Sequence, residues 1–397
     1  MKIEKELISI NDIILFLLFV ACTNIANKYF YIVFFAFAIY LFFVQRVAFN
    51  MDVICLLVIS LSFVLFAPWA RETALTIIKP FVYPACYIMG VGLISQKHNG
   101  CEIARKEKYL RNVIVLIAMG MFAHYLLNWV TNIGEEQRNT VDFWTNEILA
   151  ATNQAVMAVM ILGVAVAILF SVSGVWKKIL AVGVIVAVMM YNLILAGRTL
   201  IALFLLVCGI AAVYRLCAVK KKRLRFLMIL FGVVAVILLC WFLDAFSVRT
   251  AIEESLLYDR FTGADSLGIT DDARRENKIN YLRMIWNYPF GGANLRAQVG
   301  FSHDVLFDTF DEAGIFAFIA MIVYLTSSVV RFIKCMSDKR ISYNTKQLVL
   351  CVYSIVFMMF WLEPILMNAS WFFAGFCVID GCLCGLRRKN SGLVRLC

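Results

Sequence analysis

Long apolar runs separated by short polar breaks make up most of this chain. Runs of about 17–25 apolar residues match the length of a helix that crosses a membrane. The sequence contains twelve such runs, near residues 8–23, 28–45, 51–67, 73–94, 112–131, 148–172, 177–196, 198–216, 225–246, 305–333, 346–366 and 369–386. The pattern predicts an all-α integral membrane protein with about twelve transmembrane helices.

The residues 247–302 form the one long polar segment, between the ninth and tenth runs. Apolar residues recur at helical spacing over 273–287, and Pro289 with the pair Gly291 and Gly292 ends the pattern. This segment is predicted to be one large loop that contains an amphipathic helix. The predicted organisation is nine transmembrane helices over 1–246, the loop over 247–302, and three more transmembrane helices with a tail over 303–397.

Composition agrees with a lipid environment and excludes a soluble globular domain. The chain is 63% apolar and 16% charged, whereas soluble domains carry roughly a quarter charged residues. Its mean hydropathy is +0.85. The 13 cysteines are scattered without a CxxC pair, and no cluster of metal-ligating residues stands out, so neither a metal nor a cofactor is predicted.

The net charge of +11 does not indicate nucleic-acid binding, because most basic residues lie in short loops between apolar runs. Such residues orient a membrane protein, since cytoplasmic loops collect Lys and Arg. The basic groups at 97–111, which include His98, at 215–225 and at 331–346 are therefore predicted to be cytoplasmic. Both termini are then cytoplasmic, and the loop 247–302 lies on the outer face.

The stretch FSHDVLFDTFDEAG over 301–314 closes the polar segment and opens the tenth run. It holds His303, one of three histidines, and Ser302 is predicted to cap the helix that follows. Three carboxylates come at the helical spacing i, i+4, i+7: Asp304, Asp308 and Asp311. A titratable imidazole at a water–membrane boundary, beside an acidic helix face, is suited to proton transfer.

Ionisable residues within or at the ends of apolar runs are functional candidates, because they are costly in lipid. Four are predicted on the same side as His303: Arg71, Lys79, Arg198 and Glu363. Lys79 is expected about seven residues inside the fourth helix. Each alone is equally explained by an anchor at the lipid surface or by a buried ion pair, such as Arg198 with Glu363. Their gathering on one side favours a shared polar cavity, whereas Asp380, toward the cytoplasmic end, is expected to be structural.

The predicted cavity is cationic, because Arg274 and Arg275 of the loop add to Arg71, Lys79 and Arg198. Arginine binds phosphate oxygens in pairs, so a lipid-linked diphosphate fits this charge. Diphosphate is a good leaving group once its developing charge is neutralised, which arginine can do without a metal. A sugar hydroxyl that attacks a lipid-diphosphate-linked glycan needs a base, and His303 suits that role.

Three stretches carry a resemblance to the O-antigen ligase and O-antigen polymerase family of bacterial membrane glycosyltransferases. They are LAGRT at 195–199, the loop pattern ARRE…YLRMI…PFGG over 273–292, and SHDVL…EAG over 302–314. In the third stretch Asp304 stands where the family usually has Asn. The order of the three, with one large outer loop before the last, adds to the similarity.

The resemblance implies a GT-C-like fold in the bacterial cytoplasmic membrane, with an extracytoplasmic active site and metal-independent transfer from an undecaprenyl-diphosphate-linked oligosaccharide to an acceptor glycan. Arg198 and Arg274, with Arg275 as the alternative, would hold the diphosphate, and His303 would deprotonate or orient the acceptor hydroxyl. Lys79 is similar to a basic residue that some members carry in the fourth helix. A chain-length regulator is a further partner that the resemblance suggests.

The sequence suggests roles for four further residues and leaves three alternative functions open. Arg71 is assigned with the donor-binding residues, and Asp304, Asp308 and Glu363 are assigned to binding or orienting the acceptor. Polymerase is narrowly favoured over a ligase that acts on lipid A core or protein, because few residues separate Pro289 from His303. A lipid-linked glycan flippase or transporter is the alternative of another class, which predicts charges spread through the membrane depth.

Overall fold

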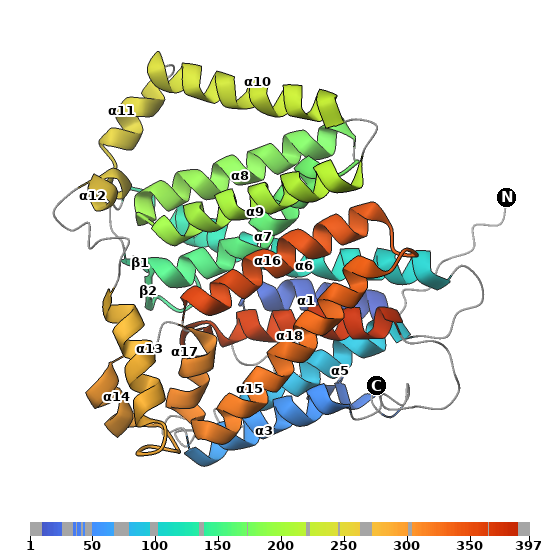
Figure 1. Cartoon of the computed structure of the whole chain (residues 1–397), viewed down its shortest axis with the longest axis vertical. Helices are drawn as coiled ribbons and strands as arrows, with labels where there is room; N and C mark the ends of the chain where they lie inside the picture. The colour runs from blue at the N-terminus through green and yellow to red at the C-terminus, as the bar shows by residue number, and fades with distance from the viewer. Residues whose placement is uncertain are drawn as a thin grey trace. The chain divides into compact units, whose positions relative to one another are not determined.

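A computed structural model shows a predominantly helical chain with one short β-hairpin (Figure 1). It divides into two compact units. Unit 1 comprises residues 1–124, 274–342 and 360–397, and unit 2 comprises residues 125–273 and 343–359. The structure describes residues 10–25, 35–36, 38–40, 43, 50–66, 79–95, 102–134, 139–172, 174–219, 223–244, 247–262, 272–300, 304–363 and 365–387.

Most elements lie within the apolar runs. Helix α6 begins at Glu102, ten residues before the predicted run, strand β2 occupies the first three residues of the run at 148–172, and most of the run at 28–45 lies outside the described residues. Their order and bounds are α1 Ile10–Cys22, α3 Met51–Phe66, η3 Lys79–Phe81, α5 Val82–Ser95, α6 Glu102–Thr131, β1 Asn139–Val141, β2 Ile148–Ala150, α7 Ala151–Phe170, α8 Val175–Leu195, α9 Arg198–Ala218, α10 Arg223–Phe242, α11 Val248–Glu253, α12 Leu256–Thr262, α13 Asp272–Met284, α14 Ala293–Val299, α15 Val305–Ser337, α16 Tyr343–Leu362, α17 Ile365–Asn368 and α18 Ser370–Arg387.

Six helices in the described ranges are long and apolar enough to cross a membrane: 103–131 within α6, and α7, α8, α9, α15 and α16. Shorter apolar helices cover Asp12–Cys22, Met51–Phe66 and Ser370–Leu386. The chain is therefore a helical membrane protein, as predicted. The count of about twelve spans and their orientation stay predictions.

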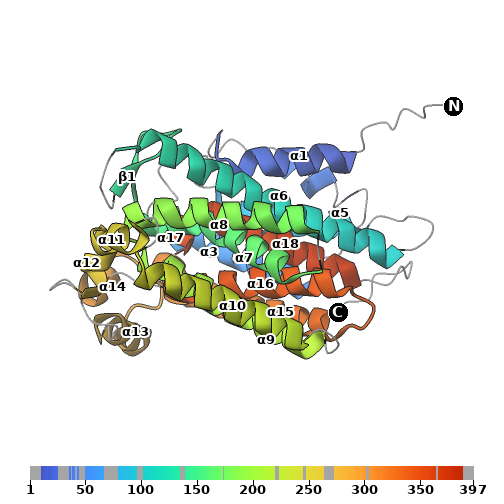
Figure 2. The ribbon, with the colours of Figure 1, turned by 90° about the horizontal axis from the view of Figure 1, so that it is seen from above.

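Unit 1 is built on close packing of α5 against α18. Gly381 and Gly385 of α18 are four residues apart, the small-residue spacing that lets membrane helices approach closely. A Cβ on Gly381 would lie 2.2 Å from the Tyr87 carbonyl oxygen, and one on Gly90 of α5 would lie 2.1 Å from the Val378 carbonyl oxygen. The two backbones therefore touch. Helix α3 packs along α15, and α1 lies beside α6 (Figure 2).

Unit 2 is built on α7, which packs against α8 and α9. Strands β1 and β2 pair in antiparallel register just before α7, with Thr140 opposite Leu149. Buried amides hold this hairpin: Asn128 Nδ2 donates to Gln154 Oε1 at 3.1 Å, and Gln154 Nε2 donates to Thr140 Oγ1 at 2.9 Å.

The polar segment contains four described helices, α11, α12, α13 and α14, where the sequence predicted one. The predicted helix corresponds to α13, which begins at Asp272 and ends at Met284, three residues before the predicted end. The expectation for Lys79 was wrong in one respect. Lys79 starts the 3₁₀ turn η3, and α5 begins only at Val82, because Pro80 and Pro84 lack the N–H groups that a helix interior needs.

Candidate functional site

The sequence stretches PFGG and EAG meet in unit 1. Helix α15 is broken at Gly314, whose φ of 77° and ψ of −173° lie outside the helical region. The break leaves backbone groups without helical partners, and the loop supplies them. Gly292 N–H donates to the Asp311 carbonyl at 2.7 Å, and Ile315 N–H donates to the Pro289 carbonyl at 2.8 Å. We call this contact, between 289–292 and 311–315, the clasp.

Glycine is required on both sides of the clasp. A Cβ on Gly314 would lie 2.8 Å from Phe290 Cα, and one on Gly291 would lie 2.3 Å from the Phe310 carbonyl oxygen. Both glycines also have positive φ, which other residues rarely adopt. The two motifs thus have a physical basis that spacing alone did not reveal, because each allows the backbone of the other to approach.

A charge cluster reinforces the clasp. Arg296 of α14 donates from Nε to Asp311 Oδ2 at 2.7 Å and forms a second ion pair with Glu312. Burial by itself lowers the pKa of the Arg296 guanidinium, but the two carboxylates more than reverse this, so its pKa lies above the ordinary value. The pair of α15 carboxylates therefore holds α14 through a fully charged arginine. The second oxygen of Asp311, Oδ1, makes no hydrogen bond within the described ranges.

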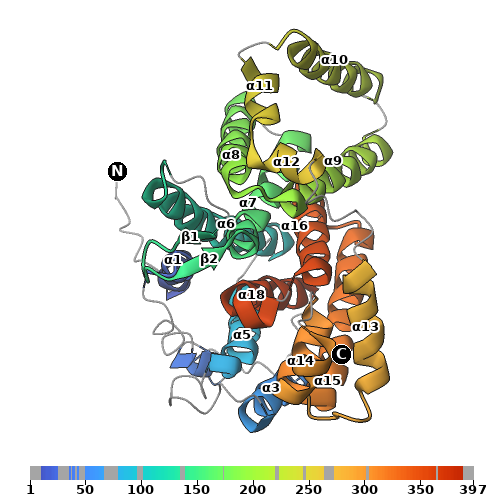
Figure 3. The same ribbon diagram turned by 90° about the vertical axis from the view of Figure 1, so that its left-hand side faces the viewer.

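Helix α13 lies beside α15 (Figure 3), and an apolar core and an ion pair hold it there. Tyr281 is fully buried and packs with Leu295, Val299 and Phe310. Burial raises the pKa of the Tyr281 phenol, whose hydroxyl donates to the Gly300 carbonyl at 2.7 Å.

At the other end of this contact, Lys278 Nζ lies 3.0 Å from Asp304 Oδ2. The same ammonium lies 4.4 Å from the centre of the exposed Trp361 ring. The α13 helix is therefore fixed to the residue that directly follows His303 in the sequence.

The acidic face of α15 is buried rather than open. Asp304, and not Ser302 as predicted, caps α15, because Phe307 N–H donates to its Oδ1 at 2.9 Å. With Oδ2 bound to Lys278, both oxygens of Asp304 have partners inside the protein. Asp308 Oδ2 accepts from Leu366 N–H at 2.7 Å, which ties α15 to α17. These two carboxylates position helices, and their assignment to the acceptor stays a prediction.

The remaining predicted residues fall in three groups. His303 and Arg71 lie outside the described residues. The backbone of Arg274 and Arg275 forms part of α13, one turn before Lys278 and Ile279, and their side chains are outside the described set. Arg198 begins α9 in unit 2, while Lys79 and the buried Glu363 belong to unit 1. Within unit 1 the structure therefore pairs Asp304 with Lys278, and Asp311 and Glu312 with Arg296. The sequence singled out neither of these two cations.

No protein-family model and no curated protein matches the chain. The family resemblance stays a prediction, and the function is argued from the residues themselves.

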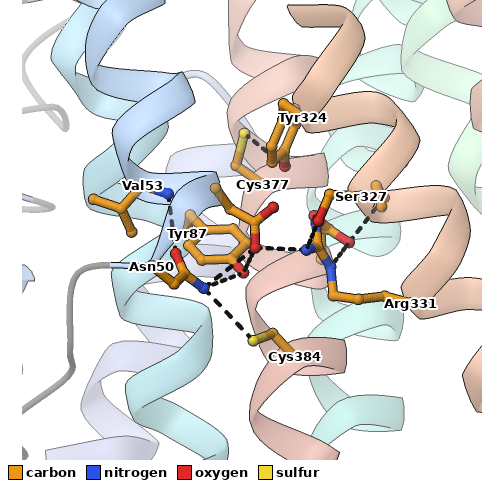
Figure 4. A network of polar contacts seen from close by, with 11 residues as sticks. Asn50, Val53, Tyr87, Tyr324, Ser327, Arg331, Cys377 and Cys384 are labelled. Atoms are coloured by element: carbon orange, nitrogen blue, oxygen red, sulfur yellow. Dashed lines mark hydrogen bonds and ion pairs between the residues drawn. The ribbon is translucent and has the colours of Figure 1, made fainter. Parts of the chain in front are cut away.

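A second polar cluster lies inside unit 1 near the other end of α15 (Figure 4). Arg331 of α15 donates from Nη1 to Asp52 Oδ2 of α3 and from Nη2 to Asp380 Oδ2 of α18, both at 2.5 Å. Tyr87 donates its hydroxyl to Asp52 at 2.7 Å. We call Asp52, Arg331 and Asp380 the buried triad.

The buried triad bears on two expectations. Arg331 was grouped with the basic residues predicted on the cytoplasmic side and also fell within the apolar run at 305–333; it lies inside α15 and is only 8% exposed, and its side of the membrane stays a prediction. The local apolar sequence around Arg331 was a usable signal, which the basic residues after it obscured. Asp380 joins α18 to α15 through Arg331, and its expected structural role stays a prediction.

Proposed function

We propose that this protein is a membrane glycosyltransferase, which moves a glycan from a lipid diphosphate to a sugar hydroxyl at the outer face of the bacterial cytoplasmic membrane. One observation carries the proposal. The clasp and the Lys278–Asp304 ion pair hold the arginine-bearing start of α13 and the entry to α15 in one compact unit. The loop stretch that suggested donor binding is therefore joined to the α15 stretch that begins at Asp304, directly after His303 in the sequence.

Helix length supports a position of this arrangement at the membrane boundary. The full α15 has 33 residues and a length of about 50 Å, which exceeds the ~30 Å hydrocarbon thickness. Residues 315–337, after the break at Gly314, extend about 35 Å and are long enough to cross it alone. The carboxylates of 304–312 can thus lie at the polar surface, where water and a lipid headgroup meet.

The proposed reaction is a displacement at the anomeric carbon. The acceptor hydroxyl oxygen forms the new glycosidic bond, its proton passes to the His303 imidazole, and the bond from the anomeric carbon to the diphosphate oxygen breaks. The electron pair leaves with undecaprenyl diphosphate, and its charge is neutralised by arginine, the role that the family resemblance assigns to Arg274 and to Arg198. Lys278 and Arg296 already pair with carboxylates, so their proposed role is to hold the loop rather than the donor.

The test measures undecaprenyl diphosphate, because this leaving group is released whichever acceptor receives the glycan. Purified protein in lipid nanodiscs is supplied with lipid-linked glycan extracted from a producing bacterium, and the release of undecaprenyl diphosphate is followed. His303→Ala should abolish release, while the matched variant His98→Ala, in a predicted cytoplasmic loop, should retain it. Release by His303→Ala at the wild-type rate would remove this residue from the mechanism.

Polymerase is the proposed subclass, with transfer to lipid A core or protein as the alternative. The supporting feature is the short chain between the clasp and His303, in which α14 is the described helix and is committed to α15 through Arg296. Little of this segment is left to form a separate acceptor surface. Products that lengthen by whole repeat units on a lipid-linked acceptor support a polymerase, and products attached to lipid A core support a ligase.

The buried triad favours a second candidate function, a flippase or transporter of lipid-linked glycan. Ionisable residues inside a helical membrane protein often mark a transport path, and this triad lies away from the acidic start of α15. Proteoliposomes distinguish the two functions. A transporter changes the leaflet of an intact fluorescent lipid-linked glycan, whereas a glycosyltransferase releases undecaprenyl diphosphate.

A further inference from the structure

Helix α13 has two apolar faces, and only one of them is covered. The face with Tyr281 packs on α15. Ile279, Leu282 and Trp286 follow at the spacing i, i+3, i+7 in and just after α13, and they are 38%, 54% and 78% exposed. The sequence predicted a single apolar face for this helix. The structure separates Ile285, which packs with the core, from these three residues, which we call the outer stripe.

The chain just after the outer stripe contacts the end of the apolar helix α3. Phe290, four residues beyond Trp286 in the sequence, is 51% exposed. Its ring stacks on Phe66, the last residue of α3, with ring centres 4.7 Å apart. The stripe thus lies near the level at which α3 ends and α15 begins.

The surfaces beside the stripe have the chemistry of a lipid contact. Leu65 of α3 precedes the stacking residue Phe66, and it is 57% exposed. Phe316 of α15 follows the clasp residue Ile315, and it is 58% exposed. A bilayer covers apolar residues on several helices at once, whereas a protein partner would have to match each of them. A tryptophan at the end of the stripe and the exposed Arg283 beside it are typical of a helix that lies in the headgroup region.

We propose that the outer stripe is inserted into the outer leaflet of the membrane, with phospholipid as its occupant. The loop is then held from two sides, by α15 through the clasp and by lipid through Ile279, Leu282 and Trp286. This surface does not depend on the proposed activity, since it would hold the loop at the membrane in a glycosyltransferase or a transporter.

Photocrosslinking tests the proposal on the full chain in membranes. A diazirine amino acid replaces Trp286 in one variant and Leu282 in a second, and the matched control carries it at Glu276, which is exposed on the polar edge of α13. The membranes contain radiolabelled phosphatidylethanolamine. After irradiation, both stripe variants should carry about tenfold more labelled lipid than the Glu276 control, because that position faces water.

Three results would overturn the proposal. Equal lipid labelling at Glu276 and Trp286 would mean that the helix has no lipid-facing side. Crosslinks from both stripe positions to a second copy would make the stripe a protein interface. Crosslinks to another segment of the same chain would show that the protein covers the stripe itself. Each variant must elute as the wild-type protein does, and undecaprenyl diphosphate release is measured separately, so a failure of this proposal is distinguishable from a failure of the proposed activity.

Discussion

The substitution Gly314→Ala should damage the protein far more than its small size suggests. At φ 77° and ψ −173°, Gly314 occupies a region that is essentially restricted to glycine, and placing another residue there costs on the order of 1–3 kcal/mol. The added Cβ would also lie 2.8 Å from Phe290 Cα, which is backbone and cannot rotate away. Moving the loop to relieve this contact threatens two backbone hydrogen bonds of about 1 kcal/mol each. We expect a loss of about 3 kcal/mol in the free energy of unfolding.

The assay is thermal unfolding of purified protein, with Gly209→Ala of α9 as the control. A Cβ on Gly209 meets nothing within 4 Å, and replacing a helical glycine by alanine gains up to about 1 kcal/mol. At roughly 2–4 °C per kcal/mol, Gly314→Ala should lower Tm by about 6–12 °C, and Gly209→Ala should leave Tm unchanged or higher. Loss of the clasp should also slow release of undecaprenyl diphosphate. Equal Tm values for the two variants would refute the argument that the clasp requires glycine.

Three further predictions address the charges. Arg331→Met should destabilise the protein by about 3–5 kcal/mol, because two buried carboxylates lose their cation. Adding Asp52→Asn and Asp380→Asn to this variant should restore most of the lost Tm. A triple variant with the same low Tm as Arg331→Met would count against a charge effect. Arg274→Ala should lower kcat/KM by about 10–100-fold, whereas Arg275→Ala should have little effect. The reason is that Arg274 precedes Lys278 by one turn, while Arg275 precedes the exposed Ile279. A larger loss of kcat/KM in Arg275→Ala than in Arg274→Ala would exchange their roles. Arg198→Lys should keep the charge but lose the paired hydrogen bonds to phosphate and raise KM for the donor about tenfold, so equal KM values would argue against a diphosphate contact.

The outer stripe and the clasp together suggest why α13 combines charged and apolar residues on so short a helix. Lys278 and Tyr281 fix it to α15, while Ile279, Leu282 and Trp286 remain exposed. A helix held in this way keeps a constant height relative to α15.

The sequence by itself determined the helices of this protein, because membrane helices are recognised by a local property. Length and hydropathy located α3 at 51–66 and the start of α9 at Arg198 within a residue or two. The same reasoning located α13 approximately, from the spacing of its apolar residues and the Pro289 that follows it. It failed at Lys79 and at the cap of α15, where the outcome depends on individual turns and side-chain bonds.

Only the tertiary structure decided which charges meet. Arg331 pairs with Asp52, 279 residues away in the chain, and Arg296 pairs with Asp311 and Glu312. The break at Gly314 could not be predicted either, because the acidic residues before it and the apolar residues after it are both compatible with an unbroken helix, and the helix is interrupted only where the loop backbone inserts. Ion pairs and backbone contacts of this kind depend on which helices are neighbours. Hydropathy identifies a segment as a membrane helix, but it does not identify the helix that lies beside it.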